Sequence, residues 1–125
     1  MPQIRRKKIL PVEKEILAFP DHYVVLPGKI AYATLKTVAK VDEDFDGAKT
    51  LKKGTVIKMD ADGTVTAAGD ADGNGIVFNT IKLDDYDESD VRINVAVLMH
   101  GVVRKDRLDG ADKLGNNKMI VAVNK

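Results

Sequence analysis

The residues of this chain that could hold a metal ion lie between Asp70 and Gly75. They read Asp-Ala-Asp-Gly-Asn-Gly, with side-chain oxygens at positions 1, 3 and 5 and glycine at position 6, as in the first half of a calcium-binding loop. The twelfth position should supply a bidentate glutamate but is Ile81, and the residues after Gly75 have a strand pattern. Asp, Asn and Gly also gather in tight turns because they tolerate positive φ. We therefore expect a turn here and no metal site.

The side chains that could run a reaction are few. The chain has two histidines, His22 and His100, a single serine, Ser89, and no cysteine. Ser89 lies among acidic residues, which disfavour an anionic nucleophile, and it has no base near it in sequence. No set of nucleophile, base and orienting group can be assembled from these residues. We expect a protein that is not an enzyme, with no catalytic residues and no cofactor.

A basic run, Arg5-Arg6-Lys7-Lys8, could contact phosphates, but a solvated tail or an acidic protein partner explains it equally well. The whole chain carries a net charge of only +1. Residues 1–20 hold five basic and two acidic residues, a net +3, which leaves 15 basic and 17 acidic residues, a net −2, for the rest. We expect a protein partner and no direct nucleic-acid binding.

Residues 1–20 are predicted to be an arm on a β-rich domain that spans 21–125. Prolines at positions 2, 11 and 20 bracket the arm, and proline fits poorly inside helices and sheets. Such a terminus is usually ordered only when a partner holds it. The arm residues predicted to contact that partner are basic or apolar: Ile4, Arg5, Arg6, Lys7, Lys8, Ile9, Leu10, Ile16, Leu17 and Phe19.

The first half of the β-rich domain contains one ambiguous segment and one clear hairpin. A short apolar run at 23–26 is predicted to be a strand that Pro27-Gly28 ends. Residues 31–41 could form a helix because of their alanines, but their loose alternation favours a strand. Asp62-Gly63 between the β-branched runs 55–59 and 64–67 predicts a hairpin.

The second half contains the strongest strand pattern. Odd-numbered residues of 91–99 give one apolar face, and the opposite face becomes apolar toward the end. We expect Gly101 to end this strand, a helical turn at 104–108, and further strands at 76–81 and 119–123. The loop 84–90 carries five acidic residues and must face solvent or a basic partner. The sequence predicts a mainly β fold, a small barrel or sandwich with one short helix and an extended N-terminal arm.

Length and composition set the outer limits. A chain of 125 residues supports one domain, and its core must be aliphatic because aromatic residues make up only 5%. The absence of cysteine suits synthesis in a reducing cytoplasm, and we expect no signal peptide. No apolar run approaches the roughly 20 residues that span a bilayer, so we expect no membrane contact.

Three segments between residues 50 and 108 resemble the head decoration (capsid cement) proteins of tailed bacteriophages. They are Leu51-Lys-Lys-Gly-Thr-Val-Ile57, Gly75-Ile-Val-Phe78 with the acidic stretch after it, and Val95–Leu108 with its central glycine. The resemblance implies a β-rich protein that binds the outer surface of an assembled phage head and stabilises it. It also implies a homotrimer at symmetry axes, N-terminal segments that reach the major capsid protein, and a location in the virion.

A phage head-fibre or carbohydrate-binding β-module remains the alternative. Sugar-binding faces usually need exposed rings, and this chain has no tryptophan and only three tyrosines and three phenylalanines. The small number of aromatic residues therefore favours the decoration protein over the carbohydrate module.

Overall fold

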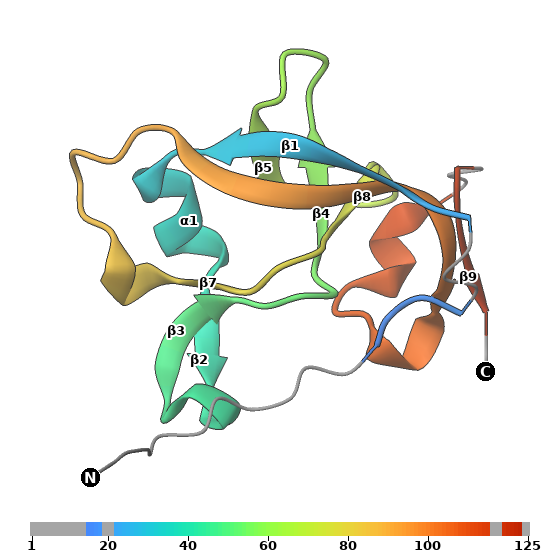
Figure 1. The fold of residues 1–125 in the computed structure, drawn as a ribbon, viewed down its shortest axis with the longest axis horizontal. Helices are drawn as coiled ribbons and strands as arrows, with labels where there is room; N and C mark the ends of the chain where they lie inside the picture. The colour runs from blue at the N-terminus through green and yellow to red at the C-terminus, as the bar shows by residue number, and fades with distance from the viewer. Residues whose placement is uncertain (1–14, 19–21, 116–118, 124–125) are drawn as a thin grey trace, which may run out of the picture.

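The computed structural model describes residues 15–18, 22–115 and 119–123, whose strands form two sheets (Figure 1). The strands are β1 (Val24–Ile30), β2 (Lys40–Asp42), β3 (Ala48–Leu51), β4 (Val56–Met59), β5 (Val65–Ala67), β6 (Gly75–Val77), β7 (Ile81–Lys82), β8 (Ile93–Arg104) and β9 (Ile120–Val123). The helical segments are α1 (Tyr32–Val38) and the short 3-10 helices η2 (Glu43–Phe45), η3 (Leu83–Asp85), η4 (Lys105–Arg107) and η5 (Ala111–Leu114).

The larger sheet is built around β8. Its strand order is β1-β8-β6-β4-β5, with β9 added to the far end of β8, and all pairs are antiparallel except β8 with β9. The sheet curls until β1 and β5 meet, where the Lys29 amide donates to the Gly63 carbonyl at 2.8 Å. This contact is an isolated bridge between Lys29 and Thr64 and not a ladder, so the sheet does not close into a barrel.

The smaller sheet has the order β2-β3-β7 and lies beside α1 at one end of the molecule (Figure 1). Together the two sheets make a small β-sandwich. The predicted mainly β fold with one short helix is confirmed, and of its two forms the sandwich is correct.

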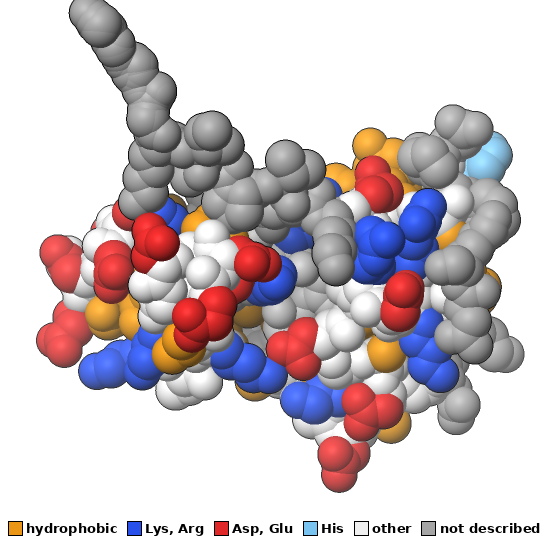
Figure 2. Space-filling view, turned by 90° about the horizontal axis from the view of Figure 1, so that it is seen from below, with side chains coloured by type: hydrophobic (Ala, Val, Ile, Leu, Met, Phe, Trp, Pro, Cys, Tyr) orange, Lys and Arg blue, Asp and Glu red, His pale blue; other side chains and the backbone are white. Residues whose placement is uncertain are grey.

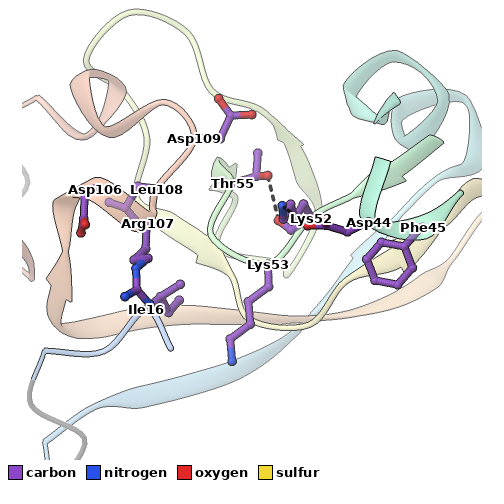
Figure 3. A pocket seen from close by; sticks show the side chains of 10 residues that line it. All are labelled: Ile16, Asp44, Phe45, Lys52, Lys53, Thr55, Asp106, Arg107, Leu108 and Asp109. Atoms are coloured by element: carbon purple, nitrogen blue, oxygen red, sulfur yellow. Dashed lines mark hydrogen bonds and ion pairs between the residues drawn. The ribbon is translucent and has the colours of Figure 1, made fainter. Parts of the chain in front are cut away.

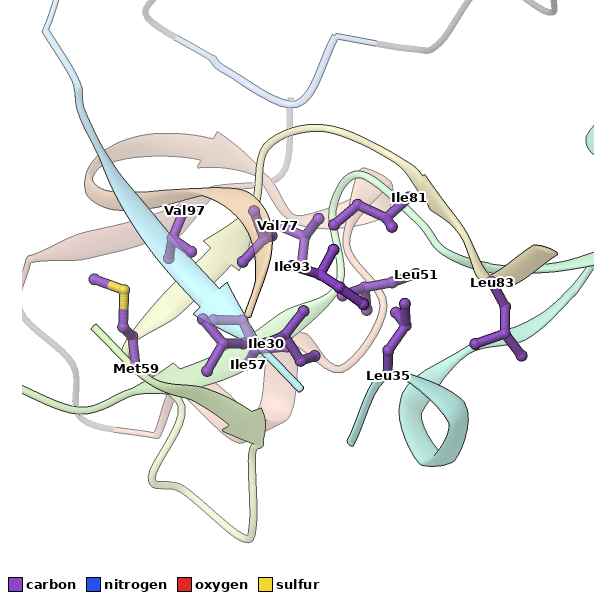
Figure 4. Close-up of a cluster of buried hydrophobic side chains, with 12 residues drawn as sticks. Ile30, Leu35, Leu51, Ile57, Met59, Val77, Ile81, Leu83, Ile93 and Val97 are labelled. Carbon is purple, nitrogen blue, oxygen red and sulfur yellow. The ribbon is translucent and has the colours of Figure 1, made fainter. Parts of the chain in front are cut away.

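Strand β8 is buried on both faces. Val97 and Leu98 point in opposite directions, and each has 0% of its surface exposed. Val97 belongs to a cluster that joins both sheets and α1 (Figure 4), made of Ile30, Leu35, Leu51, Ile57, Met59, Val65, Val77, Ile81, Leu83, Ile93, Val95 and Val97. Leu98 belongs to a second cluster on the opposite face of the larger sheet, made of Ile16, Leu17, Val56, Ala68, Ile76, Leu98, Val103, Leu114 and Ile120.

Two glycines make room for Val97. A Cβ atom on Gly75 would lie 2.5 Å from Val97 Cγ1, and a Cβ atom on Gly28 would lie 3.2 Å from Val97 Cγ2. Real Cβ atoms essentially never come within 3.0 Å of another heavy atom, and the closest contact of a Cβ on Gly28 would be Val65 Cγ2 at 2.8 Å. Both β1 and β6 therefore need a residue without a side chain at this level. Gly28 therefore lies inside β1, and it does not end that strand as the sequence had predicted.

The segment 31–41 was predicted to be a strand, and this prediction is wrong: α1 occupies Tyr32–Val38. Leu35 is fully buried, and Tyr32, Val38 and Ala39 pack against the same cluster. These positions follow a helical period of three to four residues. The alternation of alanine and threonine in this segment does not coincide with the side chains that are buried.

The prediction for β8 was right in its centre and wrong at both ends. Val91 is 67% exposed and precedes the strand, which begins at Ile93. Gly101 does not end the strand, because residues 101–104 continue it by pairing with β9. The helical turn expected at 104–108 is present as η4, and the hairpin at Asp62-Gly63 and the strand at 119–123 are confirmed as β4–β5 and β9. The strand expected at 76–81 is split into β6 and β7.

Replacing Gly75 by alanine should destabilise the fold by about 1–3 kcal/mol, the usual cost of overpacking a core. The added methyl group would be forced against Val97. Urea unfolding of Gly75→Ala, Val97→Ala and the double variant should give a double-variant loss smaller than the sum of the two single losses. Gly69→Ala is the matched control, because the nearest atom to its new Cβ would lie 3.4 Å away. Additive losses would mean that Gly75 and Val97 do not share this space.

Candidate functional site

The turn at 70–75 uses its polar side chains to hold the hairpin. The Asn74 Oδ1 accepts a hydrogen bond from the Met59 amide at 2.7 Å, and its Nδ2 donates to the Met59 carbonyl at 2.9 Å. Asp72 Oδ1 accepts from the Gly69 amide at 2.5 Å. Within the described parts of the chain, no three His, Cys, Asp or Glu side chains are grouped as metal ligands. Two of the three side chains in the spacing that resembles a calcium loop, Asp72 and Asn74, thus bind backbone groups.

The serine and the histidines are placed on separate structural features. The Ser89 hydroxyl and amide both donate to Asp87 Oδ1, which closes a turn in the acidic loop. His100 lies on β8 opposite Val24 and is exposed, as is His22. The role that the structure gives to Ser89 is to hold the acidic loop in shape.

Hydrogen bonds lower the pKa of two exposed carboxyl groups, those of Asp87 and Asp62. The pKa of Asp87 lies below its usual 3.8 because of hydrogen bonds from the side chain and backbone of Ser89. The pKa of Asp62 is lowered first by the backbone amide of Thr64 and then by the Thr64 side chain. In both cases the hydrogen bonds favour the charged carboxylate.

Ser89→Ala should raise the pKa of Asp87 toward its usual value without fully restoring it, because the backbone amide of residue 89 still donates. A depressed carboxyl pKa contributes stability above pH 3.8 that is lost as the pH falls through the lower, folded-state pKa. NMR titration of the Asp87 carboxyl carbon between pH 2 and about 6 measures the shift, with Asp62 as the internal control. An unchanged Asp87 titration would contradict the role assigned to the Ser89 hydroxyl.

The segment 15–18 is part of the body, which corrects the prediction that it belongs to a separate arm. Ile16 and Leu17 are 1% and 3% exposed and lie in the second core cluster. The Ala18 amide donates to the Val102 carbonyl at 2.8 Å, and the Arg104 amide donates to the Ile16 carbonyl at 2.7 Å. The segment therefore pairs with the end of β8, and the side chains of Ile16 and Leu17 are buried in the body and not displayed on an arm.

The physical reason for this correction is the second face of β8. Leu98 and Val103 need an apolar cover, and residues 15–18, η5 and β9 provide it. The remaining predicted arm residues lie outside the described residues: Ile4, Arg5, Arg6, Lys7, Lys8, Ile9, Leu10 and Phe19. The run Ile16-Leu17-Ala18 was the signal in the sequence, but its three residues are too few to distinguish a cover strand from an arm.

A cavity of about 390 Å³ lies next to this segment (Figure 3). One wall comes from η2 and the connection between β3 and β4, and the other from η4, the two residues that follow it and the segment 15–18. The lining residues are Ile16, Asp44, Phe45, Lys52, Lys53, Thr55, Asp106, Arg107, Leu108 and Asp109.

Many charges of this cavity already have partners. Lys52 Nζ lies 3.5 Å from Asp44 Oδ2, and Asp109 Oδ2 lies 2.8 Å from Lys40 Nζ. The Arg107 guanidinium donates to the Glu15 carbonyl at 3.0 Å, which fixes the start of the cover segment. The cavity is a charged seam between two parts of the fold, and the ion pair of Lys40 with Asp109 joins these two parts.

Exposed apolar side chains gather on two strands at the edge of the larger sheet. Val24 and Leu26 on β1 and Val121 on β9 are each more than 40% exposed, as are the adjacent Tyr23 and Met119. Both strands pair with β8, and Figure 1 shows the start of β1 close to β9. This surface was not predicted from the sequence, because 23–26 and 119–123 were predicted only as strands, without a face assigned to solvent.

Acidic side chains mark the opposite part of the surface. The exposed acidic residues of η2, of the loop around η3 and beside these elements are Glu43, Asp44, Asp46, Asp84, Asp85, Asp87 and Glu88. Acidic side chains gather at the left of Figure 2. The body thus has an acidic end and a more apolar end.

No family model matches the chain, and comparison with curated proteins and with solved structures also finds no match. In the described part of the chain, no helix is both long enough and apolar enough to cross a membrane.

Ile16→Ala and Leu17→Ala should each lower the free energy of unfolding by about 2–5 kcal/mol, the range for large-to-small changes in a core. Urea denaturation followed by circular dichroism measures the loss. Val121→Ala is the control, because the Val121 side chain is 48% exposed and should cost much less. Stabilities equal to that of the unaltered chain would restore the prediction that residues 1–20 form an arm separate from the body.

Proposed function

We propose that this chain is a capsid decoration protein that binds the outer surface of an assembled phage head as a homotrimer and bridges neighbouring major capsid subunits. The resemblance of residues 50–108 to phage decoration proteins supports this proposal. The body is mainly β, and its described polar residues hold turns and join neighbouring segments. Such a body is suited to presenting a surface to a partner, and these structural roles do not conflict with binding.

The observation that carries the proposal is the anchoring of residues 15–18. Hydrogen bonds to Val102 and Arg104 and the burial of Ile16 and Leu17 tie this segment to the longest strand of the fold. Arg107 adds a third contact through the Glu15 carbonyl. The chain before Glu15, with its basic run Arg5–Lys8, is therefore joined to the body at a fixed point.

Because residues 15–18 are anchored to β8, the protein can act as a clamp that transmits load between two capsid subunits. If residues 1–14 hold one capsid subunit and the body contacts the next, an outward load on the shell is carried by the pairing between 15–18 and β8. The ordering of an arm costs roughly 1–2 kcal/mol of backbone entropy per residue, so its apolar residues must be buried on the shell to offset that cost. In this proposal Ile4, Ile9 and Leu10 supply the buried contacts, and Arg5–Lys8 supply charge attraction.

Cosedimentation of the purified protein with undecorated phage capsids tests the proposal. The full chain should bind, and Ile9→Ser with Leu10→Ser should weaken binding strongly while leaving the melting temperature nearly unchanged. Replacing Arg5, Arg6, Lys7 and Lys8 by glutamine should weaken binding less, and mostly below about 0.1 M salt, where exposed charges act beyond about 10 Å.

Replacement of Lys36, Lys49, Lys105 and Lys113 by glutamine is the matched control, because it removes the same charge from the body. This control should bind like the unaltered protein. The proposal fails if the full chain does not sediment with any assembled shell, or if the variants of residues 5–10 bind as tightly as the control.

A further inference from the structure

A second candidate site lies on the outer face of the larger sheet, where β1, β8 and the residues after β6 meet. Its cavity is about 450 Å³ and is lined by Val25, Leu26, Pro27, Asn79, Asn94, Val95 and Ala96. Its floor is a paired sheet, since Pro27 is opposite Ala96 in the β1–β8 ladder. Among the residues that the structure describes, no carboxylate lines this groove.

An aromatic platform adjoins one end of the groove. The rings of Tyr23 and Phe78 are stacked with centroids 5.7 Å apart and an interplanar angle of 29°. Phe78 is next in sequence to the lining residue Asn79, and its amide donates to the Ala96 carbonyl at 2.9 Å. Tyr23 is 45% exposed, so a flat ring surface is open to solvent beside the groove.

Two exposed carboxamides provide polar contacts. Asn79 Oδ1 accepts from the Ala96 amide at 2.8 Å, and Asn94 Oδ1 accepts from the Lys29 ammonium. These bonds fix each carboxamide through its oxygen, which leaves the Nδ2 groups of these two lining residues to act as donors. An apolar floor with amide donors and a flat ring suits a ligand that has both apolar faces and many oxygen acceptors.

Two lysines lie next to residues of this face, although neither lines the groove itself and Lys53 also lines the first cavity. Lys29 lies beside Asn94, and the Lys53 ammonium lies 4.9 Å from the centroid of the Phe78 ring. Tyr23 and Lys29 are six residues apart on an extended strand, so the face spans about 20 Å at roughly 3.3 Å per residue. The positive charges of Lys29 and Lys53, with no carboxylate among the described residues that line the groove, are complementary to an elongated anionic ligand.

We propose that this face binds an acidic saccharide, a chain of sugar rings that carry carboxylate groups. One ring stacks on Tyr23, the hydroxyl groups accept hydrogen bonds from Asn79 and Asn94, and the carboxylates are drawn to Lys53 and Lys29. None of the residues of this site belongs to the arm or to the anchored segment 15–18, so saccharide binding can be measured without capsids.

An acidic peptide fits this face less well. A peptide strand would need backbone donors along the free edge of β1, but Pro27 has no amide hydrogen and the Lys29 amide already donates to Gly63. Side-chain stacking and amide donors, which the face does offer, are the contacts that sugar rings use.

Titration of the ¹⁵N-labelled protein with tetragalacturonate, followed by NMR, tests the proposal. The amides of Tyr23, Asn79, Asn94 and Ala96 should shift together, and maltotetraose, which has no charge, should bind at least about fivefold more weakly. Tyr23→Ala should weaken tetragalacturonate binding about tenfold or more, while Tyr23→Phe, which keeps the ring, should stay within about twofold. Lys53→Met should reduce both the affinity and its dependence on salt, whereas Lys36→Met should change neither.

Each variant is first checked for an unchanged melting temperature, and Asn94→Leu gives a second measure of the site should Tyr23→Ala unfold. Shifts that are absent at millimolar tetragalacturonate, or equal affinities for Tyr23→Ala and Tyr23→Phe, overturn the proposal. A hexaglutamate peptide that binds more tightly than tetragalacturonate at the same amides also overturns it, because the face would then recognise acidic peptides. All of these results can be obtained whether or not the protein binds capsids.

Discussion

The fold depends on burying both faces of one strand. Val97 and Leu98, adjacent on β8, each lose all contact with solvent, so the sheet needs a cover on either side. The smaller sheet and α1 cover the Val97 face, and residues 15–18, η5 and β9 cover the Leu98 face. Burial of an aliphatic side chain contributes about 1.5–3 kcal/mol. Loss of either cover would therefore remove a large part of the marginal stability of a small domain.

Short-range signals in the sequence predicted the parts of the fold that depend on local chemistry. Asp62-Gly63 specified its hairpin, because few residues other than glycine accept the backbone of Gly63, with φ of +90°. The strand at 31–41 was wrong, because burial of Leu35 against the first cluster selected a helix that alternation could not reveal. Likewise, Gly101 was expected to end β8, and only the pairing with β9 explains why the strand continues.

In the candidate sites too, features set by local residue types could be predicted, and contacts set by the tertiary fold could not. The turn role of Asp70–Gly75 could be inferred from residue types, but the bonds from Asn74 to Met59 depend on a register that no local pattern reveals. Ile16 and Leu17 were assigned to an arm because their cover partners lie some eighty positions away along the chain. The Tyr23–Phe78 stack also joins residues far apart in sequence. Six aromatic residues were too few to suggest an aromatic surface until the fold placed two of them together.

The pairing of Leu17 with Val103 also bears on the order in which the molecule folds. Contacts between residues so distant in sequence form slowly, because a long loop must close before they contribute. The cluster around Val97 can form from residues 30–97 alone, whereas the cluster around Leu98 must wait for β9. During synthesis, residues 15–18 therefore leave the ribosome long before the strand they cover exists. Until residues 15–18 pair with β8, the outer face of that strand is an exposed apolar surface. It is then the part of this chain most open to misassembly.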